Sequence, residues 1–371
     1  MSSPVLRIGL AGPLPPPSGG IANQTLQLAA LLRAEGFLVE MVQFNPPYRP
    51  AWTGRIRFLR AVVRLLPYLV QLWRTVAKVQ MLHVMANSGW SWHLFAAPAV
   101  WVAHLRGIPV IVNYRGGEAA AFLDKAAAVV RFTMKRTDAL IVPSGFLEGI
   151  FARHGMGSRV IPNVVDIARF PQRSTVPAAG RAPCLLAARN LEAIYDNATA
   201  LRTLALLRRT HPGATLLIAG SGPQRRQLEA LAAELGIAQA VTFTGAVAHH
   251  GMAALYKKAD VVLNCSLADN MPNSLLEAMA SGVPVVSSAV GGVPFLVQHE
   301  RTALLVPPQS PVAMAQAVAR LLDDAALYGA IRQAALRDVQ QYTWAGIRPR
   351  LLDVYERAVA ARYAAAAADV S

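Results

Sequence analysis

At 371 residues the chain is too long for one hydrophobic core, since single cores stop growing at about 250–300 residues, and its length predicts two domains. With 54% hydrophobic and 15% charged residues, it is neither a disordered chain nor a collagen-like fibre or polar coiled coil. The net charge of +15 is concentrated in residues 1–180, which hold 19 Lys and Arg against 7 Asp and Glu. This excess indicates an anionic partner: nucleic acid, a membrane surface or a phosphorylated ligand.

Six short apolar runs in the first half predict buried parallel strands, because strands covered on both faces are apolar throughout. They lie at residues 5–10, 38–43, 80–85, 109–113, 139–142 and 159–161. Amphipathic stretches between them predict helices at residues 21–34, 55–76 and 119–135. Residues 79–105 contain no Asp, Glu, Lys or Arg and could span a bilayer, but their histidines and Pro98 favour a strand, a polar loop and a buried helix.

The same alternation restarts after residues 171–183, whose three prolines predict an exposed linker. Five further strands are expected at residues 184–188, 215–219, 241–244, 261–264 and 283–286. Residues 311–361 are mostly helical in pattern, and Trp344 begins the last helix. Strands that alternate with helices in this way predict an α/β fold of two Rossmann-like, doubly wound domains facing a cleft.

We divide the chain into four parts: an N-terminal domain at 1–172, a linker at 173–183, a C-terminal domain at 184–341 and a last segment at 342–371. The helix of the last segment is expected to pack back toward the N-terminal domain, before a frayed tail. The first apolar run has no cationic segment before it, so no secretory signal is indicated. Cys184 and Cys265 are too few for a disulfide scaffold and form no CxxC pair, which favours a cytoplasmic protein.

Two glycine-rich loops follow predicted strands and could bind an anion. Gly19 and Gly20 precede a helix, where free backbone amides and the helix dipole favour negative charge. A similar turn with free amides is predicted at Gly220-Ser-Gly222-Pro223. Pro223 is expected to be the first residue of the following helix. Neither loop is a Walker A or GxGxxG motif, and each fits an ordinary turn between a strand and a helix as well.

The segment after the tenth predicted strand is the most informative. Pro272 and Asn273 begin a helix whose first turns hold Ser274 and Glu277, and Asp269 lies eight residues before Glu277. Two carboxylates around a group of backbone amides suit a polyhydroxylated, phosphorylated ligand, because carboxylates accept hydrogen bonds from hydroxyls and amides donate to phosphate. The alternative is that Glu277 only stabilises the start of its helix.

This segment resembles the E-x7-E signature of retaining glycosyltransferases with the GT-B fold, in particular the large family 4 (glycosyltransferase group 1) of enzymes that use nucleotide sugars. The ten residues from Glu277 match the second half of the signature, and Pro272-Asn273 matches a common variant of its middle. Further matches are Gly19-Gly20, Pro162-Asn-Val-Val-Asp166, Gly220-Ser-Gly-Pro223 and Gly291-Gly-Val-Pro294. The resemblance runs from Ile8 to about Tyr355.

The resemblance implies a role for each matching residue. Glu277 would accept hydrogen bonds from the ribose of the nucleotide, and Asp269 would contact the donor sugar. Arg189 takes the place of a diphosphate-binding arginine, which its planar guanidinium suits. The donor-binding positions would be Gly19, Gly20, Gly220, Gly222, Pro223, Asn270, Met271, Pro272, Asn273 and Ser274. Of these, the pair Gly19-Gly20 would reach the diphosphate from the opposite domain, and the loop at 220–223 would flank the base.

The chain departs from the family pattern at three places. Its first glutamate is Asp269, which is one methylene shorter, and the lysine usually found soon after the arginine is absent from residues 190–197. The histidine often present after the fourth strand is replaced by Tyr114-Arg115-Gly-Gly. We expect Arg115 to supply the missing positive charge from the other side of the cleft, and count it as catalytic with Asp269, Glu277 and Arg189.

No cofactor is expected beside the nucleotide-sugar co-substrate, a UDP- or GDP-sugar, and no metal. The Asp-x-Asp pair of the other main glycosyltransferase fold is absent from the sequence. His83, His93, His249 and His250 match no common metal-site spacing and are expected at the surface or in the cleft. Positioned cations and amides are then expected to stabilise the charge that develops on the departing nucleoside diphosphate.

Residues 41–117 contain nine Lys and Arg and no acidic residue, with aromatic residues interspersed. Apolar and basic residues fall on separate stripes of the predicted helix. The apolar stripe consists of Ile56, Leu59, Val63 and Leu66, and the basic stripe of Arg57, Arg60 and Arg64. This pattern suits peripheral contact with an anionic bilayer on the inner face of the cytoplasmic membrane, and a core helix with a solvated arginine face explains it as well. No nucleic-acid-binding motif accompanies the charge, so nucleic acid is not an expected partner.

The resemblance therefore implies a retaining glycosyltransferase of the hexosyltransferase class, and we expect it to be metal-independent. It would move a sugar from a nucleotide donor to a saccharide or lipid-linked acceptor, in the assembly of a cell-surface polysaccharide or glycolipid. A nucleotide-sugar epimerase of the same architecture is one alternative, against which the Gly-Gly loop and the paired carboxylates argue. A non-catalytic glycosyltransferase-like subunit is another, suggested by the missing lysine and histidine.

Overall fold

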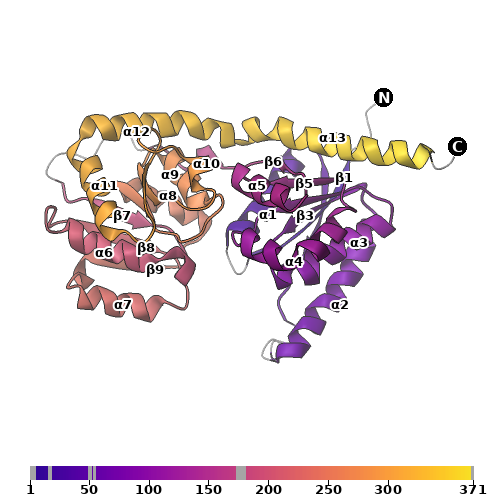
Figure 1. Cartoon of the computed structure of the whole chain (residues 1–371), viewed down its shortest axis with the longest axis horizontal. Helices are drawn as coiled ribbons and strands as arrows, with labels where there is room; N and C mark the ends of the chain where they lie inside the picture. Colours follow the sequence, from indigo (N-terminus) through magenta and orange to yellow (C-terminus); the bar gives the residue numbers. More distant parts are fainter. Residues whose placement is uncertain (1–5, 16–18, 49–51, 53–55, 173–180, 369–371) are drawn as a thin grey trace. The chain divides into compact units, whose positions relative to one another are not determined.

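The structure is a computed structural model that describes residues 6–15, 19–48, 52, 56–172 and 181–368. Its contacts divide the chain into a first unit, Met1–Val164 with Ile347–Ser371, and a second unit, Val165–Gly346 (Figure 1). Each unit contains a six-stranded sheet, and every strand pairing in both sheets is parallel. The predicted α/β fold with two Rossmann-like domains is confirmed.

The boundary between the units differs from the predicted one. Residues 165–170 belong to the second unit and not, as the sequence suggests, to the first. Val165 and Phe170 are buried in the core of the second unit, and the Val165 amide donates a hydrogen bond to the Tyr342 carbonyl (2.9 Å). The last helix, α13 (Trp344–Ala368), belongs to the first unit from Ile347 onward. Most of the predicted linker lies outside the described residues.

The first unit has the strand order β2-β1-β3-β4-β5-β6. Its strands are β1 (Arg7–Gly12), β2 (Leu38–Gln43), β3 (Met81–Ala86), β4 (Val110–Tyr114), β5 (Ala139–Val142) and β6 (Arg159–Val160). Side chains alternate between the two faces of the sheet. Leu82 and Val112 enter the main core of this unit, whereas their neighbours His83 and Asn113 hydrogen-bond to each other on the opposite face.

Helices cover both faces of the first sheet. They are α1 (Gly20–Ala34), α2 (Arg57–Val76), α3 (Ala97–Leu105), α4 (Ala119–Met134), α5 (Gly145–Arg153) and α13, with a π-helical turn η2 (Trp92–Ala96) before α3. In Figure 1, α2, α3 and α4 lie beside one another, and side chains from all three fill the main core. On the opposite face, Tyr355 of α13 contacts His83. Residues 79–105 thus form the predicted strand, loop and helix.

The second unit has the strand order β12-β11-β10-β7-β8-β9. Its strands are β7 (Cys184–Ala187), β8 (Thr215–Ala219), β9 (Val241–Gly245), β10 (Val261–Asn264), β11 (Val285–Ser288) and β12 (Leu304–Val306). The helices are α6 (Asn197–Leu207), α7 (Arg225–Glu234), α8 (His249–Lys258), α9 (Asn273–Ser281), α10 (Val293–Leu296), α11 (Pro311–Asp323) and α12 (Ala325–Asp338). Two separate buried clusters, one on each face of the sheet, hold the layers together.

All eleven predicted strands are present, with bounds that differ by two residues at most. The twelfth, β12, was not predicted, because its three residues are too few to show a periodic pattern. No helix among the described residues is long and apolar enough to cross a bilayer.

Candidate active site

Four loops of the second unit begin where neighbouring parallel strands end. Strand β7 leads to Arg189, β8 to Gly220, β10 to Asp269 and β11 to Gly291. Because the carboxyl ends of parallel strands meet at one edge of a sheet, the four loops gather there, and ligands of open α/β sheets bind at this edge.

Arg189 and Asp269 form an ion pair at this edge. A terminal nitrogen of the guanidinium donates to Asp269 Oδ2, and the two side chains are only 14% and 12% exposed. The guanidinium carbon lies 4.1 Å from the ring centroid of Tyr195, which a 3₁₀ turn, η4 (Ala193–Tyr195), places beneath it. Arg189 Nε is buried without a hydrogen-bond partner. Leaving a buried cationic donor unpaired is costly, so this nitrogen suits an oxygen of an anionic ligand.

The carboxylate of Asp269 is fixed by groups of its own loop. Ser266 Oγ lies 3.3 Å from Oδ2, and the Asn270 amide donates to Oδ1 (2.9 Å). The backbone carbonyl of Asp269 accepts from the Gly292 amide (2.9 Å), and a Cβ at Gly291 would lie 2.1 Å from the same oxygen. Gly291 also has a φ of +52°, a conformation that favours glycine. Gly291 and Gly292 therefore support the loop that carries Asp269.

Glu277 lies in the second turn of α9 and accepts a hydrogen bond from the Tyr256 hydroxyl at Oε2 (2.9 Å). Burial raises the pKa of Glu277 to about 7, although the Tyr256 hydrogen bond and the positive charge of Arg189 both lower it. At neutral pH the carboxyl group is therefore divided between its charged and neutral forms. A group poised in this way inside a cluster of polar side chains is typical of functional sites.

The start of α9 presents a second polar atom without a partner. The helix begins at Asn273 after Pro272, and Ser274 Oγ is buried without a hydrogen bond. The two preceding residues, Asn270 and Met271, are buried, and the Met271 side chain is part of the core. The predicted donor loop thus buries the side chains of Asn270 and Met271, which leaves its backbone and the Ser274 hydroxyl as candidate contacts with a ligand.

The loop at 220–223 differs from its prediction in two respects. The Gly220 amide is not free, because it donates to the Gly245 carbonyl (3.0 Å). Pro223 is not a first helical residue, because α7 begins at Arg225. A Cβ at Gly220 would lie 2.2 Å from the Arg189 carbonyl oxygen, and one at Gly222 would lie 2.4 Å from that of Leu191. These glycines let the loop pack against the backbone that carries Arg189, a long-range requirement that the motif does not reveal.

Gly19 and Gly20 belong to the first unit. Gly19 flanks the N-terminus of α1, where no side chain caps the helix, and Gly20 is the first helical residue and exposed. The structure thus places them at a helix N-terminus, as predicted, and their role toward a diphosphate stays a prediction.

Arg115 follows β4 in the first unit and is held by two asparagines. Its Nε donates to Asn113 Oδ1 (3.1 Å) and a terminal nitrogen donates to Asn163 Oδ1. No carboxylate among the described residues pairs with it. Burial lowers the pKa of Arg115 to about 10, so the side chain stays charged at neutral pH.

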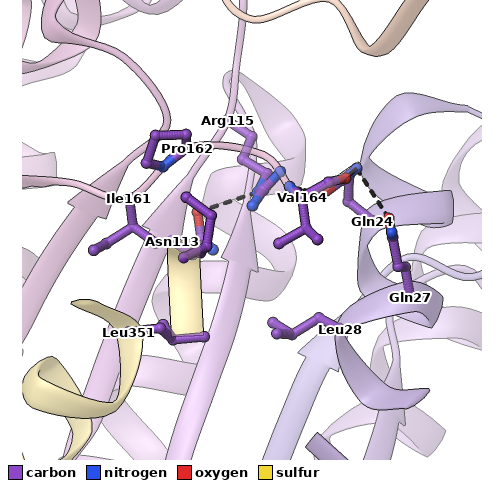
Figure 2. A pocket seen from close by; sticks show the side chains of 10 residues that line it. Gln24, Gln27, Leu28, Asn113, Arg115, Ile161, Pro162, Val164 and Leu351 are labelled. Atoms are coloured by element: carbon purple, nitrogen blue, oxygen red, sulfur yellow. Dashed lines mark hydrogen bonds between the residues drawn. The ribbon is translucent and has the colours of Figure 1, made fainter. Parts of the chain in front are cut away.

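A pocket opens beside Arg115 at the carboxyl edge of the first sheet. Figure 2 shows Arg115 and Asn113 facing Gln24 and Gln27 of α1 across this pocket. Gln24 is tied to Val164, donating to its carbonyl (3.0 Å) and accepting from its amide (3.3 Å). A cation held by neutral amides at such an edge is suited to an anionic ligand.

His83 is not at the surface or in a cleft, contrary to the prediction. It is fully buried, with Nδ1 2.8 Å from the Tyr355 hydroxyl and Nε2 3.1 Å from Asn113 Nδ2. Burial and the charge of Arg115 lower its pKa to about 3. The neutral imidazole accepts from Asn113 and donates to Tyr355, so it links α13 to the asparagine that orients Arg115. In sequence, nothing distinguishes this histidine from a surface one.

The remaining histidines do not form a metal site within the part of the chain that the structure describes, where no group of three or more His, Cys, Asp or Glu could hold a metal ion. His93 is partly buried and contacts the Phe122 ring. The side chains of His249 and His250 are outside the described part.

Sequence reasoning missed three residues of the candidate site. Tyr195 lies beneath Arg189, Tyr256 binds Glu277, and Ser266 contacts Asp269. Tyr195 occupies the segment in which the family's lysine is missing, which was the one available signal. Tyr256 lies on α8, 21 residues before its partner, and no local pattern links the two.

Two family models match the chain. One, described as "Glycosyl transferase 4-like domain", matches residues 19–164, and the other, "Glycosyl transferases group 1", matches residues 183–324. Among curated proteins, a GDP-mannose-dependent alpha-(1-6)-phosphatidylinositol monomannoside mannosyltransferase of Mycobacterium tuberculosis is 30% identical over 94% of this chain and 97% of its own length. A glycogen synthase of the same organism is 31% identical over 71% of this chain and 66% of its own length.

Two solved structures share the fold over almost their whole length. A sucrose-phosphate synthase from Thermosynechococcus elongatus superposes with a TM-score of 0.76 and 24% identity, covering 96% of this chain and 100% of that one. The Anabaena protein HepE, crystallised with UDP and glucose, superposes with a TM-score of 0.73 and 17% identity, covering 95% and 99%.

Proposed function

Because the chain belongs to the group 1 glycosyltransferases, the family 4 type with the GT-B fold, we propose that it transfers a sugar from a nucleotide-sugar donor. One observation supports this most: the buried Arg189 Nε and Ser274 Oγ lack hydrogen-bond partners at the loop edge that also holds Asp269 and Glu277. Unpaired donors beside carboxylates suit a ligand that carries both phosphate and hydroxyl oxygens.

We assign a role to each residue of this edge. Arg189 binds the diphosphate and stabilises its charge as the bond to the sugar breaks. Asp269 and the backbone from Met271 to Ser274 hold the sugar and its phosphate, and Glu277 accepts from the ribose hydroxyls. The Arg189–Asp269 pair of the ligand-free protein keeps both groups in place, and the guanidinium still has donors to offer a diphosphate, because it carries five N–H groups.

We further propose that transfer retains the anomeric configuration and needs no metal, since Arg189 and the amides of the loop supply the positive charge that a departing diphosphate requires. The donor is a UDP- or GDP-sugar. The acceptor is a saccharide or a lipid-linked saccharide in cell-surface polysaccharide or glycolipid assembly, reached from the cytoplasmic side of a membrane. The mycobacterial relative, whose name specifies a phosphatidylinositol mannoside, supports a lipid-linked acceptor.

These proposals can be tested together in one experiment. Donor cleavage by the purified protein is monitored by proton NMR in a reaction that contains EDTA. We expect release of nucleoside diphosphate. We also expect the released sugar to appear first as the anomer that the donor carried. Inversion of the anomer would contradict retention, and loss of turnover in EDTA that added Mg²⁺ restores would contradict metal independence. An epimerase would convert the donor sugar without net release of diphosphate, and a non-catalytic subunit would leave the donor intact.

Arg115 is proposed to bind an anionic group of a substrate, since its guanidinium has no carboxylate partner among the described residues and borders a pocket. Arg115→Ala should lower turnover about 10- to 100-fold, the effect of removing one charge-assisted hydrogen bond or more. Arg115→Lys should restore part of it. Full turnover and donor affinity in Arg115→Ala would contradict the role, with Arg153→Ala, an exposed residue of α5, as the control.

A further inference from the structure

The buried His83 lies in the middle of a chain of hydrogen bonds that ends at Arg115. Its Nε2 lies 3.1 Å from Asn113 Nδ2, and Asn113 Oδ1 accepts from Arg115 Nε (3.1 Å). On the other side of the ring, Nδ1 lies 2.8 Å from the hydroxyl of Tyr355 on α13. His83, Asn113 and Tyr355 are each at most 2% exposed, so water does not compete for these contacts.

The direction of each hydrogen bond follows from Arg115. A guanidinium carries donors only, so the oxygen of the Asn113 amide faces Arg115 and its NH2 group faces His83. His83 Nε2 therefore accepts. Because burial and the charge of Arg115 lower the pKa of His83 to about 3, the ring is neutral at neutral pH and its one proton is on Nδ1. Nδ1 then donates to the Tyr355 oxygen.

A proton on the other nitrogen of His83 would disturb Arg115. With the proton on Nε2, two N–H groups would face each other between His83 and Asn113, and the amide would have to turn over. Its NH2 group would then face the donors of Arg115, and the guanidinium would lose its hydrogen bond to Asn113. The contact between His83 and Tyr355 thus holds the guanidinium in place through Asn113.

Helix α13 also forms part of the pocket beside Arg115. Ile347 and Leu351 line this pocket, and Figure 2 shows Leu351 there. Both lie on the same face of α13 as Tyr355, because the three residues are spaced four positions apart. This helix therefore supplies an apolar wall of the pocket and, one turn further, the hydroxyl group that fixes the cation of the pocket.

We propose that His83 and Tyr355 are positioning residues for Arg115, so that α13 is needed to preorganise the anion-binding group of the first unit. Both residues are buried and act on the guanidinium through Asn113, without contact with a substrate. This inference rests on the proposed function, in which Arg115 binds an anionic group of a substrate.

NMR of the full-length, isotope-labelled protein at neutral pH measures this arrangement directly. Proton–nitrogen correlation spectra, assigned by comparison with His83→Gln and Arg115→Lys, show which ring nitrogen of His83 carries the proton, and we expect Nδ1. His83→Leu and Tyr355→Phe should speed up the exchange of the Arg115 Nε proton with water by about tenfold. His83→Gln should keep this exchange slow, because the glutamine oxygen can accept from Asn113 in place of Nε2.

Turnover shows whether the positioning matters for the reaction. Tyr355→Phe and His83→Leu should each lower turnover about 3- to 10-fold, which is less than the loss in Arg115→Ala. His83→Gln should recover most of this loss. In the Arg115→Ala background, His83→Leu should cause no further loss, because its effect passes through the guanidinium.

A matched control removes a different contact between α13 and the first unit. Arg348 Nε donates to a carboxylate oxygen of Glu35, the residue that ends α1 (2.6 Å). Arg348→Ala should keep the turnover and the slow Arg115 exchange of the wild-type protein. Thermal melting of every variant shows whether it is folded. Where His83→Leu melts early, Tyr355→Phe and the proton position in wild-type His83 decide the question.

Four results would overturn the proposal. They are a proton on Nε2 of wild-type His83, equal Arg115 exchange in the wild type and the variants, unchanged turnover in folded His83→Leu and Tyr355→Phe, and an equal effect of His83→Leu with and without Arg115. The NMR samples contain no nucleotide sugar. The expected spectra from a protein that cleaves no donor would therefore contradict the proposed function and not the positioning of Arg115. Donor cleavage with equal exchange in all variants would contradict the positioning alone.

Discussion

Replacing Arg189 with alanine should lower donor cleavage by about 100-fold or more, the cost of removing one preorganised group that stabilises developing negative charge. Arg189 is only 14% exposed, its Nε has no partner, and its position is fixed by Asp269 and the Tyr195 ring. It is therefore preorganised before a donor binds. The measurement is the rate of nucleoside diphosphate release at saturating donor, with a separate titration for donor affinity.

Two further variants make this result specific. Arg189→Lys keeps the charge but loses the planar fork, so it should recover only part of the rate. Arg320→Ala removes an arginine from an exposed ion pair with Glu300 elsewhere in the second unit, and should turn over like wild type. A rate for Arg189→Ala within threefold of wild type would remove this residue from the mechanism.

Donor affinity should rise with pH between about 6 and 8, and Glu277→Gln should abolish the dependence. The pKa of Glu277 is raised by burial to about 7, so the carboxylate that accepts from ribose hydroxyls is depleted below that pH. If only the ionised form binds, affinity falls by up to about tenfold for each pH unit below the pKa. Donor titrations from pH 5.5 to 8.5 measure this slope directly.

The same group has the opposite effect on the stability of the ligand-free protein. A carboxyl whose pKa in the folded chain lies above its ordinary value of 4.5 binds more protons when folded. Its contribution to the free energy of unfolding is present in full below pH 4.5 and is lost as the pH rises through 7.

The donor titrations need a control variant. Glu300→Gln, at an exposed site, should leave the pH profile of donor affinity unchanged. An identical slope in wild type and Glu277→Gln would assign the titration to another group.

The sequence was sufficient for most of the fold because the information is local. Short apolar runs predicted eleven strands, and amphipathic stretches predicted helices between them. The spacing of Asp269 and Glu277, with the loop between them, indicated the candidate site. Strand β12 and the place of residues 165–170 were not predicted, because they depend on packing against distant parts of the second unit.

The finer structure of the site depends on contacts between residues far apart in the chain. Arg189 and Asp269 are both recognisable in sequence, but their ion pair across 80 positions is not. The glycines at 220 and 222 look like amide donors to a ligand, yet the structure uses them to bring two backbones together. His83 was expected at the surface or in the cleft, but it is buried and contacts Tyr355 of α13, 272 residues later in the chain. Burial and pairing of this kind are set by tertiary structure and leave no local pattern.

We propose that the second unit binds a nucleotide sugar at the edge formed by Arg189, Asp269, Ser274 and Glu277. The most direct measurement is a thermal-shift panel of UDP-, GDP- and ADP-sugars with the wild-type protein and Arg189→Ala. A ligand at 100 times its Kd adds about 2.7 kcal/mol to the free energy of unfolding, which is a shift of several degrees. One donor should raise the melting temperature of the wild-type protein. The same donor should raise the melting temperature of Arg189→Ala much less. No response of wild type to any nucleotide sugar, or an equal response of both proteins, would contradict the assignment.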